Sequence, residues 1–178
     1  MTNLSEASAL DEALDIETLY RRHFGFVCRS ALRLGAEPAS IDDIAQEAFV
    51  VAARRLSEFE GRANVRTWLF AITLRVVQSH RRWLRRQRRK QDAYAETSTA
   101  SERPFDKADA ATTLLQLLHR LPESHRTVYI LGELEGMSCA EIGRGLGLNP
   151  NTTYSRLRKA REQMQEEVQR MLAQEQVG

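Results

Sequence analysis

Acidic residues are missing from one stretch of this chain. Residues 61–91 hold ten of the 26 lysines and arginines and none of the 24 aspartates and glutamates. The rest of the sequence has 16 basic residues against 24 acidic ones, so the formal net charge of +2 conceals a strongly basic segment. A run of like charge this dense requires a counter-charge, and the phosphate backbone of nucleic acid is the commonest one. A solvated helix end is the alternative interpretation of the run when it is considered alone.

The sequence also has little of what metal, redox or catalytic sites require. Its two cysteines, Cys28 and Cys139, are far apart and lack metal-ligand spacing, which favours small buried residues. The four histidines form no metal-binding motif. No Gly-rich phosphate loop, paired-carboxylate cluster or nucleophile–base motif is present. We therefore expect no catalytic residues, no metal and no cofactor, and we do not expect an enzyme.

Long apolar runs are absent as well. No segment approaches the roughly 18 consecutive apolar residues that span a bilayer. The N-terminus lacks the basic and then apolar order of a signal peptide. The sequence therefore predicts a cytoplasmic protein without membrane insertion.

Helical periodicity dominates the sequence, and no convincing strand pattern or internal repeat is found. A chain of 178 residues allows one or two small domains. We predict an all-α fold of two small helical domains joined by a flexible linker. The expected order is an acidic N-terminal tail at 1–15, a first domain at 16–91, a polar linker at 92–109 and a second domain at 110–178.

The first domain is expected to contain three helices. The first runs over residues 16–34 and ends near Gly35. The second opens at Ser40, with Asp43 three residues later as a variant of the capping box. Asn64 can cap the third helix, which carries the basic run.

The second domain opens with two helices. Leucines build the first of them, and Pro122 starts the next, which we expect to stop at Gly136. Ser138 and Glu141 then have the spacing of a capping box, which opens a third, short helix.

Residues 138–161 follow the order of a helix, a tight turn and a second helix. Gly147 supplies the turn, and Asn149 is a good N-cap for a long last helix. This spacing is typical of the helix-turn-helix, whose second helix enters the DNA major groove. An ordinary helical hairpin with a polar surface is the alternative. The outward side chains of the last helix are hydrogen-bonding or cationic, which suits base edges and phosphates: Asn151, Thr152, Tyr154, Ser155, Arg158 and Lys159, with Arg156 and Arg161 at the flanks.

Two stretches carry a family resemblance. The second domain contains the stretch LPESHRTVYILGELEGMSCAEIGRGLGLNPNTTYSRLRKARE. This stretch resembles the DNA-binding domain of bacterial RNA polymerase sigma factors, and more narrowly that of the extracytoplasmic-function group. The first helical domain of that group is similar to DIAQEAFVVAARRLSEFEGRANVRTWLFAITLRVVQSHRR. The Asp-Ile-Ala-Gln-Glu start, the Phe-x-Gly loop and the Thr-Trp-Leu opening of the third helix follow one another in the order typical of that group. The chain is thereby identified as a member of this group, which is group IV of the sigma-70 family.

The resemblance implies a sigma factor, which binds core RNA polymerase and directs promoter-specific transcription initiation. In that family the first domain binds a coiled-coil of the polymerase, and the matching residues here are Asp43, Gln46, Glu47 and Phe49. Phe49 has a second interpretation as a core residue. The resemblance also allows an anti-sigma factor as a partner, although no residue identifies one.

The resemblance further implies that the first domain melts the promoter −10 element and binds its single strand. Trp68 is in phase with the apolar face, which favours a core position, whereas Trp83 either anchors its helix or contacts DNA. The chain departs from the family pattern at Arg75 and Ser79, where relatives commonly carry Asn and Asp. The base that is read therefore does not follow from relatives. The implied −10 residues are Phe59, Gly61, Arg62, Asn64, Arg66, Arg75, Ser79, Arg82 and Arg86.

In the second domain, the family reads the −35 element as duplex DNA. Tyr154, Ser155, Arg158 and Lys159 match its base-contacting positions, with Arg156 and Arg161 nearer phosphate. Two other classes of function fit the sequence less well. A stand-alone helix-turn-helix regulator leaves the first domain unexplained, and an enzyme acting on nucleic acid lacks its motifs.

Overall fold

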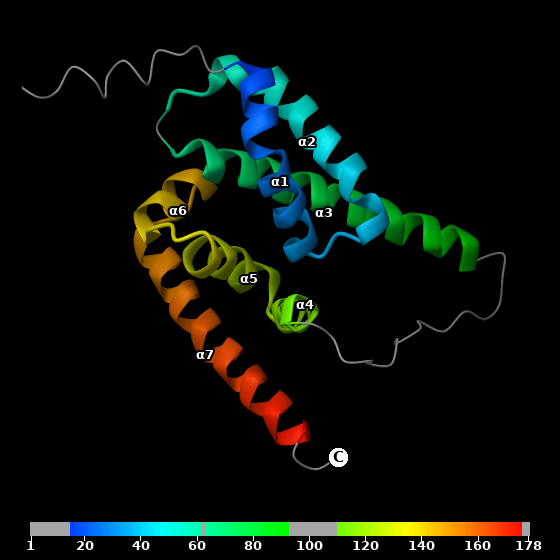
Figure 1. The fold of residues 1–178 in the computed structure, drawn as a ribbon, viewed down its shortest axis with the longest axis vertical. Helices are drawn as coiled ribbons and strands as arrows, with labels where there is room; N and C mark the ends of the chain where they lie inside the picture. Colours follow the sequence, from blue (N-terminus) through cyan, green and yellow to red (C-terminus); the bar gives the residue numbers. More distant parts are fainter. Residues whose placement is uncertain (1–14, 62, 93–109, 176–178) are drawn as a thin grey trace, which may run out of the picture.

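The computed structural model describes residues 15–61, 63–92 and 110–175, and every regular element in these ranges is helical (Figure 1). Short 3₁₀ turns at Pro38–Ser40 and Leu56–Glu58 precede and follow the second helix. The α-helices are α1 (Ile16–Leu34), α2 (Ile41–Arg55), α3 (Val65–Asp92), α4 (Ala110–Arg120), α5 (Glu123–Tyr129), α6 (Cys139–Leu146) and α7 (Pro150–Glu175). The all-α prediction is confirmed.

The ends of α1 follow from local hydrogen bonds. The Asp15 side chain accepts from the backbone N–H of Thr18 at 2.8 Å and caps the start of the helix. Gly35 ends the helix with φ +96°, a conformation that costs a Cβ-bearing residue energy. Its N–H reaches the Leu32 carbonyl at 3.0 Å. The predicted bounds of this helix are confirmed.

The predicted capping box at the start of α2 is wrong. The Ser40 side chain makes no capping hydrogen bond, and its backbone (φ −105°, ψ 1°) is outside the extended region that capping residues use. The preceding 3₁₀ turn, which begins at Pro38, runs directly into α2, and the Ile41 N–H donates to the Pro38 carbonyl. The predicted cap of α3 is confirmed, because Asn64 Oδ1 accepts from the Arg66 N–H at 2.9 Å.

In the second domain, the helix expected between Pro122 and Gly136 is present but changes its winding. Regular α5 ends at Tyr129 and continues as a π-helical turn over Ile130–Leu134, which the sequence did not predict. The capping box of Ser138 and Glu141 is confirmed.

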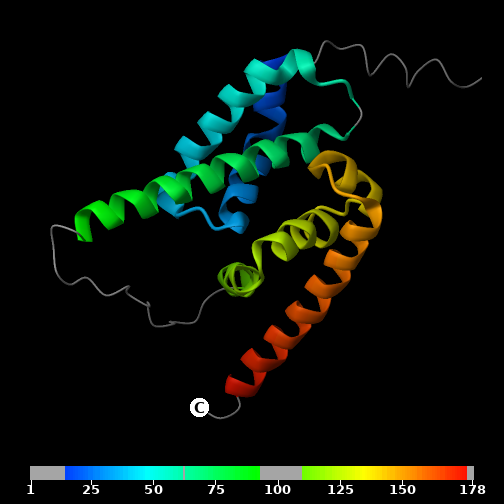
Figure 2. The same cartoon turned by 180° about the vertical axis from the view of Figure 1, so that it is seen from behind.

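The two domains pack against each other in this structure. The α4, α5 and α6 helices contact α1 or α3, while α7 lies along the outer side of α5 and α6 (Figures 1 and 2). The carboxyl-terminal part of α3 extends beyond this packed region (Figure 2). The predicted linker at 92–109 and tail at 1–15 fall almost entirely outside the described residues.

Candidate nucleic-acid interface

The last helix is fixed against its neighbours by a buried stripe. Thr153, Leu157, Ala160 and Met164 are all buried, as predicted for the inward face of α7. Two glycines allow close approach at this contact. A Cβ at Gly132 would lie 3.1 Å from the Leu157 methyls, and a Cβ at Gly143 would lie 2.9 Å from a backbone carbonyl oxygen. These contacts determine which side chains of α7 point outward.

The predicted −35 residues all lie on α7 and are brought together on its outer surface. Asn151, Tyr154, Ser155, Arg158, Lys159 and Arg161 are exposed, and Thr152 and Arg156 are half-buried at the edge. Tyr154 is 62% exposed, so it contributes little to the core. Arg158 makes only a loose ion pair with Glu162, at 3.7 Å between Nη1 and Oε1.

Two neighbours of this surface were missed by sequence reasoning. His125, from the start of α5, lines a shallow hollow with Asn151, Ser155 and Lys159. Its Nδ1 lies 2.7 Å from the Oε1 of Gln163 on α7, within hydrogen-bonding distance. No sequence signal connects His125 to α7, because the contact is made only by tertiary packing.

Glu133 is the second such neighbour. Glu133 lies in the π-helical turn, outside α7. Its carboxylate accepts a hydrogen bond from the Nε of Arg161 at 2.8 Å. Arg161 is therefore held at the flank of the surface by this ion pair.

The loop before α3 and the start of that helix hold the first of the predicted −10 residues, which differ in their exposure and contacts. Asn64 is exposed and Gly61 adopts φ +67°, whereas Phe59 packs on Trp68 with ring centroids 4.9 Å apart. Arg66 forms an ion pair with Glu135 of the second domain and lies 4.7 Å over the Phe26 ring. Arg62 falls outside the described residues.

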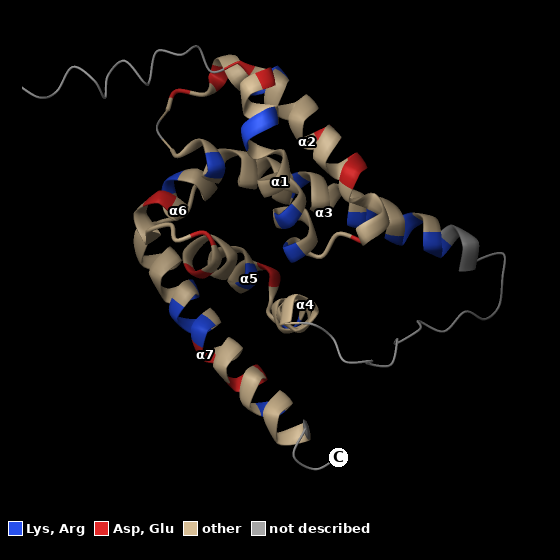
Figure 3. Ribbon diagram, in the orientation of Figure 1, with Lys and Arg blue, Asp and Glu red and all other residues tan. Residues whose placement is uncertain are grey.

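Farther along α3, a basic face stays open. Arg75, Ser79, Arg82 and Arg86 recur at helical spacing, and all are exposed. Trp83 is 48% exposed, which argues against a core role and favours a contact role for it. Figure 3 shows the basic residues along α3 and on α7.

The predicted polymerase-binding residues separate into two groups. Asp43, Gln46 and Glu47 are exposed on α2. Phe49 is only 5% exposed and packs against Tyr20, with ring centroids 4.9 Å apart, so its core interpretation holds. A buried ring cannot itself present a binding surface.

Two apolar side chains missed by the sequence analysis stand beside this acidic face. Tyr20 of α1 is 42% exposed and Val50 of α2 is 49% exposed. Val50 follows Gln46 by one helical turn, and Tyr20 lies on Phe49. The surface is thus an acid and amide face with an apolar edge.

Within residues 15–61, 63–92 and 110–175, no group of metal-ligating side chains is assembled. None of the helices in these ranges is long and apolar enough to cross a bilayer.

Comparisons with known proteins agree with this architecture. The family models Sigma-70 region 2 and Sigma-70, region 4 match residues 19–90 and 111–164. The RNA polymerase sigma-H factor of Pseudomonas aeruginosa is 31% identical over 144 residues, which cover 73% of this chain and 74% of that protein. The ECF RNA polymerase sigma factor SigL of Mycobacterium tuberculosis is 30% identical over 164 residues, covering 90% of this chain and 92% of that protein.

A solved structure has the same fold. The sigma factor RpoE of Bartonella quintana, crystallised with the anti-sigma factor NepR, superposes with a TM-score of 0.68 at 21% identity, covering 86% of this chain and 96% of that one.

Proposed function

Since this chain belongs to the sigma-70 family, as an extracytoplasmic-function sigma factor, we propose that it binds core RNA polymerase and directs it to promoters through two separate DNA contacts. The second domain contacts the −35 element as duplex, and the first contacts the −10 element as single strand. Both are binding functions, so the proposal requires no catalytic residue.

The outer surface of α7 is the observation that carries the −35 assignment. Its inward stripe is fully used in packing, which leaves hydrogen-bonding and cationic side chains exposed along one helix face. A helix of this width fits the major groove, where arginine pairs with guanine and hydroxyls or amides pair with other base edges. Arg158 is the best candidate for a base contact, because its only ion pair among the described residues is long and solvent-exposed.

The −10 assignment is supported by the basic face of α3. Arg75, Arg82 and Arg86 are exposed and have no carboxylate partner within the described residues. A groove or stripe of cations that follows the backbone, with an aromatic ring beside it, is a common arrangement for single-stranded nucleic acid. Trp83 supplies such a ring.

The polymerase contact is assigned to the acid and amide face of α2. Exposed carboxylates suit an arginine-rich partner, since bidentate pairs between them are strong. The half-exposed Tyr20 and Val50 add the apolar surface that interface centres commonly contain.

Reconstitution with bacterial core RNA polymerase tests the proposal. We expect transcripts with defined start sites only when this chain is added. Replacing Asp43 by Asn and Glu47 by Gln should weaken co-purification with the polymerase, whereas Glu17→Gln, an exposed change on α1, should not. Sequence-specific duplex binding without any polymerase association would instead identify a stand-alone regulator.

A further inference from the structure

We propose that the hollow between α5 and α7 holds one backbone phosphate of a DNA duplex, and that His125 of α5 is a DNA contact outside the last helix. This inference rests on the −35 role proposed above for α7. It adds a second helix to that contact, which fixes where the duplex lies on the domain. The α5–α7 hollow is lined by His125, Asn151, Thr152, Ser155, Arg156 and Lys159.

The hollow lies along one edge of α7. Thr152 and Arg156 are one helical turn apart, and Gln163 follows Arg156 by two turns, so the three share this edge. Thr152 and Arg156 are half-buried, and the hollow places His125 of α5 beside them. The α5–α7 hollow is therefore continuous with the exposed face of α7 that we assign to the base pairs.

The dimensions of B-DNA bring a strand to this edge. A helix with its side chains is about 10–12 Å across, and the major groove is about 12 Å wide. A helix in the groove therefore has the phosphates of one strand along each of its edges. When the exposed face of α7 meets the base pairs, one strand passes over the α5–α7 hollow, and the other passes the edge that carries Tyr154 and Arg161.

The hollow has the charge that a phosphate requires. Arg156 and Lys159 contribute two cations, and no carboxylate of the described residues lines it. Neither cation has a carboxylate partner in the described part of the chain, whereas Arg161 on the opposite edge pairs with Glu133. Residues three apart on a helix are neighbours, so these two like charges repel each other. An anion in the hollow would stabilise both of them.

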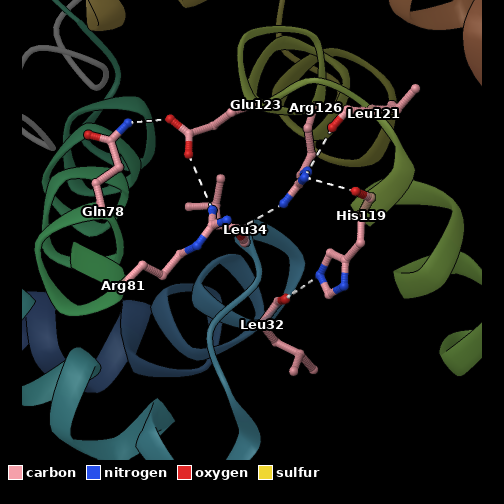
Figure 4. A network of polar contacts seen from close by, with 8 residues as sticks. All are labelled: Leu32, Leu34, Gln78, Arg81, His119, Leu121, Glu123 and Arg126. Atoms are coloured by element: carbon pink, nitrogen blue, oxygen red, sulfur yellow. Dashed lines mark hydrogen bonds and ion pairs between the residues drawn. The ribbon is translucent and has the colours of Figure 1, made fainter. Parts of the chain in front are cut away.

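His125 is held in place before any DNA binds. Its Nδ1 lies 2.7 Å from the Oε1 of Gln163. The next residue, Arg126, fixes the start of α5, because its guanidinium donates to the carbonyls of His119 and Leu121 at 3.1 and 3.0 Å (Figure 4). A side chain that is already ordered loses little conformational entropy on binding.

The ring of His125 keeps one nitrogen for a ligand. Among the described residues, none makes a hydrogen bond with its Nε2. The amide of Gln163 has both a carbonyl oxygen and an NH₂ group, so by turning over it can accept from Nδ1 or donate to it. With the NH₂ group at Nδ1, a neutral ring carries its proton on Nε2, and a protonated ring carries one there in either case. Nε2 can therefore donate to a phosphate oxygen.

Neutralising single phosphates of the DNA tests the contact directly. A duplex that the full chain selects from a random-sequence pool is prepared with one uncharged methylphosphonate at a time. Binding is measured by fluorescence anisotropy at fixed salt for the original chain, His125→Ala and Arg156→Gln. Ser124→Ala, an exposed change next to His125 and outside the lining of the hollow, is the matched control. Circular dichroism and melting temperatures check that each variant is folded.

We expect one phosphate at the edge of the selected site to respond to both residues. Neutralising it should weaken binding of the original chain and of Ser124→Ala by about two- to tenfold, the range of one hydrogen bond. His125→Ala and Arg156→Gln should respond clearly less at this phosphate, because each already lacks one of its ligands. Arg156→Gln should also reduce the salt dependence of binding by about one released counterion.

Equal responses of the original chain and His125→Ala at every phosphate would overturn the contact by His125. Responses of His125→Ala and Arg156→Gln at two different phosphates would overturn the shared hollow. If the full chain selects no duplex, both the contact and the −35 role are wrong. If the response is present on the selected duplex but polymerase with this chain starts at no defined promoter, the proposed function fails while the phosphate contact stands.

Discussion

Arg158→Ala tests whether the outer face of α7 reads base pairs or only holds the DNA backbone. The side chain is 60% exposed and its partner Glu162 is 57% exposed, so the residue contributes little to the fold. Arg170 offers a matched control on the same helix. It is 63% exposed and pairs with Glu166 at 3.6 Å and also with Glu167 at 2.6 Å, and it lies three turns farther along α7.

The expected loss of folding stability is clearly smaller than the expected loss of DNA-binding free energy. Loss of an exposed pair one helical turn apart costs about 0.3–0.5 kcal/mol of stability. Loss of a bidentate contact from arginine to a base costs about 1–3 kcal/mol of binding, or roughly 5- to 150-fold in affinity. Arg158→Ala should therefore weaken DNA binding while its melting temperature stays close to that of the original chain.

The assay is a titration of duplexes that differ by one base pair across the −35 element, at fixed salt because phosphate contacts depend on it. Arg158→Ala should lose discrimination at one position, and Arg170→Ala should bind every duplex as before. If Arg158→Ala instead weakens binding equally on all duplexes, this residue touches only phosphate. The base-reading argument is then refuted for it.

Three further predictions concern stability. Leu157→Ala opens a cavity against Gly132 and should cost about 2–5 kcal/mol in thermal or chemical denaturation. Ser138→Ala removes the capping box and should cost about 1 kcal/mol in the same measurement. Burial, and then the charge of Arg126, lower the pKa of His119 from its ordinary 6.5, so the unfolded chain binds a proton more readily. Stability should fall as the pH drops below about 6.5, and the melting temperatures of His119→Gln should depend less on pH.

The ends of helices were largely predictable because their signals are local. Gly35, Asn64 and the pair of Ser138 and Glu141 act within a few residues of the helix they start or end. The prediction for Ser40 is wrong because two local signals compete there, and the 3₁₀ turn that begins at Pro38 leaves the Ser40 backbone outside the extended conformation that a capping residue uses.

Site residues were predictable where one helix determines their direction. The buried stripe of α7 sets its phase, so the exposed face follows from the sequence. Phe49 was left ambiguous because Tyr20, from a different helix, covers it. His125 and Glu133 were missed for the same reason, since their partners on α7 are distant in sequence.

The charge pattern of the sequence identifies the basic helix but not which of its cations are available. Arg66 and Arg81 have carboxylate partners from the second domain, and Arg88 pairs with Glu37 at 2.9 Å. The cations of α3 that remain exposed and unpaired within the described residues include Arg75 and Arg82. The acidic remainder of the chain is therefore partly an internal counter-charge, and fewer cations of α3 are available to a partner than the sequence alone indicates.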